Sequence, residues 1–212
     1  MCGRYTLTKK EMKIVSKLPP GELELFFRER FNIAPTQTAP VILAESDHIT
    51  NRVMRWGLQP VWSPYLIINA KAETLKDKPS FRDSFLSRRC LVPADGFYEW
   101  RKPEKTPFRF ALPSREPFCF AGLWSESRLK NATEPTETFA IITTNASPDV
   151  APVHQRMPLI LTSDQYDDWL ADTTKAEAII AAPCPVKLDS YIISNLVNKA
   201  TNEDPKCIEP LS

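Results

Sequence analysis

Proline limits the folds open to this chain more than any other feature. The sequence holds 20 Pro among 212 residues, about twice the usual share, and only 5 Gly. Proline fixes its backbone torsion φ and has no N–H to donate, so in sheets it is confined to edges and strand ends. The prolines are spread through a chain that has no low-complexity stretch. They therefore predict many fixed, extended connections and strands at sheet edges.

Hydrophobic patterns predict more strands than helices. Residues 41–44 and 49–56 flank a polar turn and predict a hairpin. Further strands are predicted at 65–68, 90–92, 96–100, 108–112, 118–124, 139–144, 159–161 and 188–193, and helices at 81–87, 164–170 and 175–182. Helices and strands do not alternate, so we expect an α+β fold, a single domain over residues 1–212 with a mostly antiparallel, curled sheet and flanking helices. The tail after about residue 198 is expected to be loosely held.

Two more helices are predicted near the N-terminus. Thr8 and Glu11 have the spacing of a capping box, which predicts a helix that the prolines at 19 and 20 end. A second helix is predicted from the helical spacing of apolar residues within 23–30.

Charge and cysteine content exclude several classes of protein. Lys and Arg number 27 against 26 Asp and Glu, which gives a formal net charge of +1. No apolar run approaches the ~18–20 residues of a membrane helix, and charged residues interrupt any signal-peptide pattern. The five cysteines are odd in number and form no CxxC pair, which favours reduced thiols in the cytoplasm. With only two His and no clustered ligands, we expect no metal site, and we expect no cofactor.

The most informative residue is Cys2. Cellular removal of Met1 favours a small second residue, and it would leave an α-amine and a thiol on one residue. The reference pKa of an α-amine is about 7.7 against about 10.4 for Lys, so much more of it is neutral at pH 7. A neutral amine attacks an aldehyde to give an imine, and the thiol then closes a five-membered thiazolidine ring. The alternative is a frayed terminal thiol without function.

Three further places carry groups suited to chemistry. An apolar stretch ends in Asn69 and Lys71, which suit a substrate oxygen or terminal amine and a phosphate respectively. Glu99 lies among aromatic residues, where desolvation would raise its pKa and suit it to proton transfer. His154 lies between two prolines, and its reference pKa near about 6.5 suits it to donate or accept protons. Each also has a structural interpretation: Asn69 ends a strand, Glu99 lies on a solvated edge, and a lone His is more often structural.

Six short motifs, taken together and in this order, resemble the SOS response-associated peptidase (SRAP) family. They are MCGR at the start, FNIAP at 31–35, RWGL at 55–58 with Trp62, INAKAET at 68–74, CLVPADGFYEW at 90–100 and HQRMP at 154–158. Residues 188–198 resemble the family's closing segment. Each motif is weak alone, but six in order over most of the chain are strong evidence.

The resemblance implies an α+β domain with a pseudo-barrel sheet, in the cytoplasm and at the nucleoid when bound to DNA. It implies that Cys2, exposed by loss of Met1, forms a covalent thiazolidine with the ring-opened aldehyde of an abasic site in single-stranded DNA during the SOS response. By resemblance, Asn69, Glu99 and His154 surround this cysteine. His154 and Glu99 would assist sugar-ring opening and proton transfer, and Asn69 would orient the amine and the sugar-phosphate. The name peptidase refers to self-processing at Met1, and crosslink reversal would be a lyase-type activity.

The resemblance also implies contacts to the DNA backbone and to unstacked bases. The matching positions are Arg4, Trp62, Lys71, Trp100, Thr143 and Arg156. The chain departs from the family at Lys71, where members often carry Arg; Lys keeps the charge but loses the bidentate fork. Because the net charge is near zero, DNA binding requires basic residues to gather in one groove. The candidates for that groove are Arg4, Arg55, Lys71, Arg88, Arg89, Arg101 and Arg156.

Two alternatives to a monomeric crosslinking protein remain open. One is an N-terminal-nucleophile or Cys–His hydrolase of peptides or amides, with Cys2 as nucleophile, His154 as base and Asn69 or Glu99 as the orienting group. The other is a non-catalytic binder of modified or single-stranded DNA, in which Cys2 is incidental. The same four residues serve both chemistries, so the sequence does not separate them.

Overall fold

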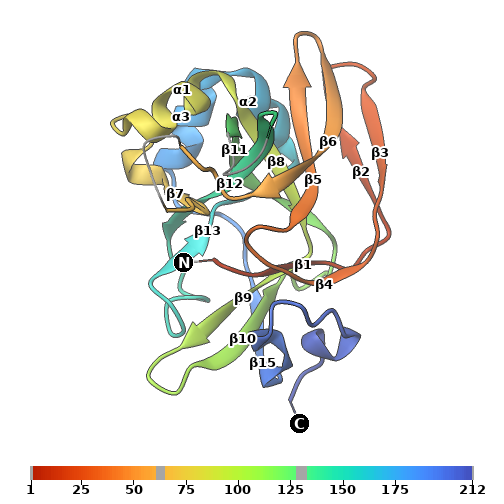
Figure 1. Ribbon diagram of the computed structural model, residues 1–212, viewed down its shortest axis with the longest axis vertical. Helices are drawn as coiled ribbons and strands as arrows, with labels where there is room; N and C mark the ends of the chain where they lie inside the picture. The colour runs from red at the N-terminus through yellow and green to blue at the C-terminus, as the bar shows by residue number, and fades with distance from the viewer. Residues whose placement is uncertain (1, 61–64, 128–132, 212) are drawn as a thin grey trace.

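Two twisted sheets form most of the molecule (Figure 1). The computed structural model describes residues 2–60, 65–127 and 133–211. Among these residues, one sheet has five strands, in the spatial order β15 (Asp189–Ile192), β10 (Thr106–Ala111), β9 (Gly96–Arg101), β1 (Tyr5–Leu7) and β4 (Arg30–Ile33). The pairings within this sheet are antiparallel.

The second sheet is larger and curls back on itself. Its order is β13 (Arg156–Pro158), β12 (Thr136–Asn145), β6 (His48–Trp56), β5 (Thr38–Glu45), β8 (Arg89–Ala94), β11 (Phe118–Ser127) and β14 (Ile160–Leu161), and β7 (Asn69–Lys71) also pairs with β12. Strand β12 additionally pairs with β11, so the strand order returns toward its beginning. Only the pairings of β12 with β6 and β7 are parallel among the described strands.

Helices cover the outer face of the larger sheet (Figure 1). They are α1 (Pro79–Ser87), α2 (Tyr166–Ala171) and α3 (Thr173–Ala181), with 3-10 turns η1 (Ala72–Thr74), η2 (Ser163–Gln165), η3 (Asn195–Asn198) and η4 (Pro205–Ile208). Phe85 and Trp169 meet there with ring centroids 6.1 Å apart. No helix in the described part of the chain is long and apolar enough to cross a membrane.

The main core lies between the two sheets and is rich in aromatic side chains. Tyr5 of β1 packs edge-on against Trp56 of β6 at 5.2 Å, and Trp56 stacks on Phe139 of β12. These side chains are fully buried, and burial of one large apolar side chain contributes about 1.5–3 kcal/mol. Because Cys2 belongs to the same cluster, the packing that joins the sheets also fixes the start of the chain. The predicted single α+β domain with a curled, mostly antiparallel sheet is confirmed.

The two helices predicted near the N-terminus are wrong. Residues Glu11–Val15 form strand β2, and Glu22–Phe26 form its antiparallel partner β3. In β2, buried Met12 and Ile14 alternate with exposed neighbours, which is the period of a strand. Thr8 caps no helix, because its N–H and hydroxyl donate to the Asp95 carboxylate. Thr8 therefore bonds to a residue far away in the sequence and not to the first turn of a helix.

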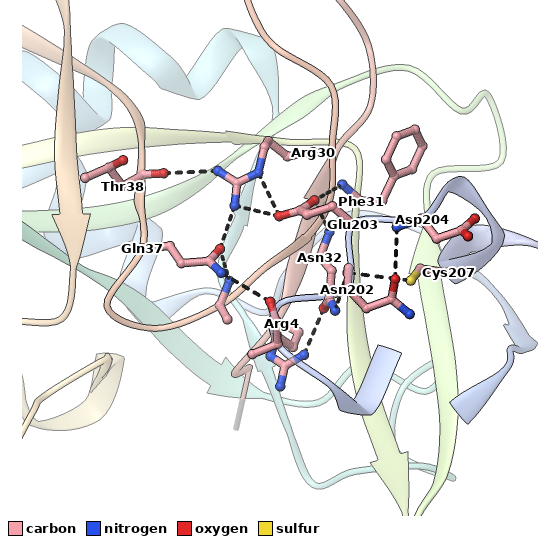
Figure 2. Close-up of polar contacts among 12 residues, drawn as sticks. Arg4, Arg30, Phe31, Asn32, Gln37, Thr38, Asn202, Glu203, Asp204 and Cys207 are labelled. Atoms are coloured by element: carbon pink, nitrogen blue, oxygen red, sulfur yellow. Dashed lines mark hydrogen bonds and ion pairs between the residues drawn. The ribbon is translucent and has the colours of Figure 1, made fainter. Parts of the chain in front are cut away.

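Two other expectations also changed. The strand predicted at 65–68 begins later, as β7, and only Ile67 forms an isolated bridge, to Leu58. The segment after residue 198, expected to be loose, packs on the five-stranded sheet. Figure 2 shows Glu203 facing Arg30, with Nη2 of Arg30 2.7 Å from Oε1 of Glu203. Buried Cys207 anchors the next turn.

Candidate functional site

Cys2 lies three residues before β1, inside the core between the sheets. Its side chain is fully buried, and its thiol donates to the carbonyl oxygen of Arg4 at 3.6 Å. Burial raises the pKa of the Cys2 thiol far above its ordinary value, and the nearby Glu99 carboxylate raises it further. The thiol is therefore protonated at neutral pH.

A buried polar cluster fixes the strand that follows Cys2. The Asp95 carboxylate accepts hydrogen bonds from the hydroxyls of Thr6, at 2.5 Å, and Thr8, at 2.7 Å. Arg109 pairs with the same carboxylate at 3.3 Å, and both side chains are almost fully buried. Since a buried charge is costly unless it is paired, this cluster holds β1 against β9.

Arg4 faces the tail of the chain. Its guanidinium donates to Oδ1 of Asn32 at 2.9 Å and to the carbonyl oxygen of Val197 at 2.6 Å. Asn32 in turn donates to the carbonyl oxygens of Lys199, at 3.0 Å, and Asn202, at 2.9 Å, as Figure 2 shows for the labelled side chains. In this structure Arg4, expected at the DNA, joins the start of the chain to its end.

Asn69 connects β7 directly to Cys2. Its amide Nδ2 donates to the carbonyl oxygen of Cys2 at 2.8 Å. Its Oδ1 is buried and has no hydrogen-bond partner among the described residues. An unpaired buried acceptor is costly, and such groups are typical of functional sites. Asn69 therefore presents an open acceptor next to the residue that it holds.

Buried Glu99 and half-buried His154 form an acid–base pair close to Cys2. Oε1 of Glu99 lies 4.0 Å from Nδ1 of His154, and the Glu99 side chain is 4% exposed. Burial raises the pKa of the Glu99 carboxyl, while nearby positive charge, including that of His154, opposes the shift. Nδ1 of His154 lies 2.9 Å from the backbone nitrogen of Arg156 and 3.0 Å from its carbonyl oxygen, so the backbone of Arg156 holds the ring in place in either tautomer. The pair is suited to hold and release protons near Cys2.

Arg156 lies beside this pair, but protein groups occupy its guanidinium. It bonds both carboxylate oxygens of Glu73, Nη1 to Oε1 at 2.5 Å and Nη2 to Oε2 at 2.9 Å, and it donates to the carbonyl oxygen of Thr143 at 2.6 Å. Arg156 lowers the pKa of the Glu73 carboxyl. Thr143 itself is fully buried, so its side chain offers no surface to a DNA strand in this structure.

The other residues expected at the DNA are placed as follows. Lys71 ends β7 and is exposed, two residues beyond Asn69. Trp100 follows the buried part of β9 and is half-buried, and its indole N–H donates to Oδ1 of Asn198 at 2.7 Å. Trp62 lies outside the described residues.

The expected groove of basic residues is only partly present. Arg89 is buried and donates to the carbonyl oxygens of Trp169 and Phe85, so its assignment to a DNA groove is wrong. The Arg89 side chain, at the start of β8, lies instead against the backbone of α1 and α2. Arg88 lies 5.9 Å over the ring of Trp124.

Several residues that shape the site escaped the sequence analysis. Asn32, Glu73 and Asn198 hold Arg4, Arg156 and Trp100 respectively. These contacts join residues 28 to 98 positions apart, so no local spacing indicates them. The sequence signals were that Asn32 and Glu73 lie within two of the six motifs and that Asn198 ends the segment 188–198, which resembles the family's closing segment. Within the described ranges, no group of three or more His, Cys, Asp or Glu side chains is placed to bind a metal.

Comparisons with known proteins cover most of the chain. The profile of the SOS response associated peptidase (SRAP) family matches residues 1–200. The abasic site processing protein YoqW of Bacillus subtilis is 35% identical, over 99% of both chains, and the abasic site processing protein HMCES of Gallus gallus is 29% identical, over 87% of this chain and 67% of its own. Among solved structures, a phage-related protein from Bordetella bronchiseptica superposes with a TM-score of 0.73 at 27% identity, covering 92% of this chain and 95% of its own. A protein from Bacteroides thetaiotaomicron superposes with a TM-score of 0.70 at 31% identity, over 84% and 82%. This chain therefore belongs to the SOS response associated peptidase (SRAP) family.

Proposed function

We propose that this chain recognises abasic sites in single-stranded DNA and forms a covalent thiazolidine crosslink through Cys2 after Met1 is removed. It acts as a monomer in the cytoplasm, at the nucleoid when bound to DNA, and shields the lesion during the DNA damage response. The names of its relatives as abasic site processing proteins support this substrate. The observation that carries the chemistry is the position of Cys2, held at its carbonyl by Asn69 and close to Glu99.

The state of the Cys2 thiol decides the order of the steps. Because burial raises its pKa, the thiol is a poor first nucleophile at neutral pH. The α-amine has a reference pKa of about 7.7 and attacks first. It adds to C1′ of the ring-opened sugar, water leaves to give the imine, and the S–H then adds across the C=N bond. One water is released in total, and the thiol proton ends on the ring nitrogen.

Glu99, His154 and Asn69 supply what these steps require. The raised pKa of Glu99 lets it hold a proton for the departing hydroxyl. The His154 ring, 4.0 Å from Glu99, opposes the rise in the pKa of that carboxyl, and it can exchange protons with solvent because about a quarter of its side chain is exposed. The unpaired Oδ1 of Asn69 accepts from the amine and aims its lone pair at the aldehyde.

The same thiol argues against the Cys–His hydrolase. That chemistry needs a thiolate, which a neighbouring base or positive charge must stabilise. Here the charged group with the largest effect on the pKa of the Cys2 thiol is the Glu99 carboxylate, which raises that pKa and so disfavours the thiolate. Removal of Met1 by the chain itself remains part of the proposal, as does reversal of the crosslink by opening of the ring.

Intact mass measurement with an abasic single strand tests the proposal. The wild-type protein should lose Met1 and gain a denaturant-resistant adduct of strand mass less one water. Cys2→Ala should give no stable adduct, but it keeps the α-amine, so borohydride should trap its imine. Acetylation of the amine should abolish both products. If the acetylated protein still forms the adduct, the amine does not attack and the proposed mechanism is wrong.

A further inference from the structure

A surface pocket of about 350 Å³ lies beside His154. Two parts of the chain form it: the end of β9 and the turn after it, with Arg101 and Lys102, and the segment 151–156. In Figure 1 this turn is the tip of the β9–β10 hairpin at the lower left, below the segment that leads into β13. The pocket shares His154 and Arg156 with the candidate site, but Cys2 is not in its lining.

The charges around this pocket are unbalanced. Its described lining holds Arg101, Lys102 and Arg156 but no carboxylate. Glu73 neutralises Arg156, whereas neither Arg101 nor Lys102 has a carboxylate within 4.0 Å among the described residues. The Arg101 guanidinium lies 5.0 Å over the ring of Phe108, an arrangement that steadies it. Two positive charges are therefore available to an anion at this pocket.

A third available cation lies at the opposite end of the site. Lys71 is exposed at the end of β7 and makes no ion pair with a described carboxylate. It follows Asn69, whose amide holds Cys2, by two residues. In Figure 1, β7 lies above β13 and the β9–β10 hairpin lies below it. The available cations thus belong to elements on two sides of β13, the strand that begins two residues after His154.

We propose that the pocket at Arg101 and Lys102 binds a backbone phosphate of the reacting strand, on the other side of the abasic sugar from the phosphate contact that the family resemblance gives to Lys71. This inference rests on the proposed function, because it takes the reacting strand as the ligand. A sugar linked to Cys2 leaves the strand running away from it in both directions, and each phosphate carries a negative charge. Since the chain has a net charge of only +1, local cations must provide the neutralisation that a basic domain would spread over its surface.

The test compares two double variants that change the net charge equally. Arg101→Gln/Lys102→Gln removes the two available positive charges of the pocket. Both substituted side chains are exposed. Lys17→Gln/Lys206→Gln removes two exposed charges elsewhere, in the turn between β2 and β3 and in η4, and serves as the control. Binding is measured by fluorescence anisotropy with an intact single-stranded oligonucleotide, so no covalent step is involved.

The pocket variant should bind the intact strand roughly three- to tenfold more weakly at low salt than the control does. Its plot of log K against log salt should be shallower by about 0.7 for each phosphate that the variant no longer neutralises. If the two double variants bind alike, only net charge matters and the inference is wrong.

A second arm tests the two-sided path. Crosslinking rates are measured with abasic strands that carry nucleotides only on the 5′ side or only on the 3′ side. The Arg101→Gln/Lys102→Gln variant should be slow with one of these strands, and Lys71→Gln with the other. Equal slowing of either variant on both strands would overturn the assignment.

Failure of the proposed crosslinking function and failure of the phosphate-site inference give different results. If wild-type protein forms no adduct but the pocket variant still loses affinity for the intact strand, the phosphate site stands and the proposed chemistry fails. If wild-type protein forms the adduct and the pocket variant matches its control in both arms, the chemistry stands and this inference fails.

Discussion

Asp95→Asn should destabilise the protein far more than Asp189→Asn, although both remove an Arg–Asp ion pair of the same length. The N–O distance is 3.3 Å for Arg109–Asp95 and 3.3 Å for Arg115–Asp189. The first pair is 6% and 2% exposed at its two side chains, and the second is 46% and 47% exposed. Burial is therefore the main difference between them.

The magnitude follows from what each substitution leaves behind. Asp95→Asn leaves the buried Arg109 guanidinium without a counter-charge, and it weakens the hydrogen bonds from Thr6 and Thr8. Removing one partner of a buried pair costs about 3–5 kcal/mol in the free energy of unfolding. The exposed Arg115–Asp189 pair is screened by water, and its loss costs about 0–1 kcal/mol.

Urea unfolding of wild type and both variants, in one buffer, gives the comparison. We expect the midpoint to fall sharply for Asp95→Asn and little for Asp189→Asn, with the slope m unchanged. Because the Asp95 cluster holds the strand that follows Cys2, the crosslinking rate should also fall only in the first variant. If the two variants lose the same stability within about 0.5 kcal/mol, burial does not decide the strength of this pair and the reasoning is refuted.

Three further predictions concern single side chains. Burial raises the pKa of the Glu99 carboxyl in the folded protein. The contribution of this carboxyl to stability is therefore present below its unfolded pKa of about 4.3 and is lost as the pH rises through the folded pKa. In urea unfolding, the stability of Glu99→Gln relative to wild type should accordingly be greater at pH 7 than at pH 4. Glu73→Gln should free Arg156 and tighten binding of an intact single strand roughly two- to fivefold in anisotropy at low salt. Glu203→Gln should lower the unfolding free energy by about 1–2 kcal/mol, since its carboxylate accepts from Arg30 at 2.8 Å and also from two backbone N–H groups of β4.

Each of these has a result that contradicts it. A difference between Glu99→Gln and wild type that is the same at pH 4 and pH 7 would show that the carboxyl is not perturbed by burial. Unchanged binding by Glu73→Gln, with Glu177→Gln as the matched exposed control, would show that Glu73 does not restrain Arg156. A stability loss below about 0.5 kcal/mol in Glu203→Gln would mean that the tail is not held through this carboxylate.

Strands with strong local patterns were predictable, and elements defined by distant partners were not. The hairpin of β5 and β6 follows from two apolar runs around a polar turn, and in β5 both faces are buried at residues 41–43. By contrast, Thr8 and Glu11 have the spacing of a helix start, yet Thr8 bonds to Asp95, 87 residues away. A local pattern loses to a buried carboxylate because an unsatisfied buried charge costs more than a helix cap contributes.

The sequence by itself determined the fold class, and it singled out Cys2 as the residue proposed to react. The bifunctional chemistry of an N-terminal cysteine is a property of the residue, and the excess of short apolar runs over helical patterns favours a sheet whatever the packing. Only the tertiary structure decided which basic residues remain available. Arg4, Arg89 and Arg156 have the same sequence character as Arg101, but carbonyl oxygens and carboxylates from distant segments occupy them. A guanidinium is satisfied by whichever acceptors the fold brings within about 3 Å, and those acceptors are set by chain topology rather than by neighbours in the sequence.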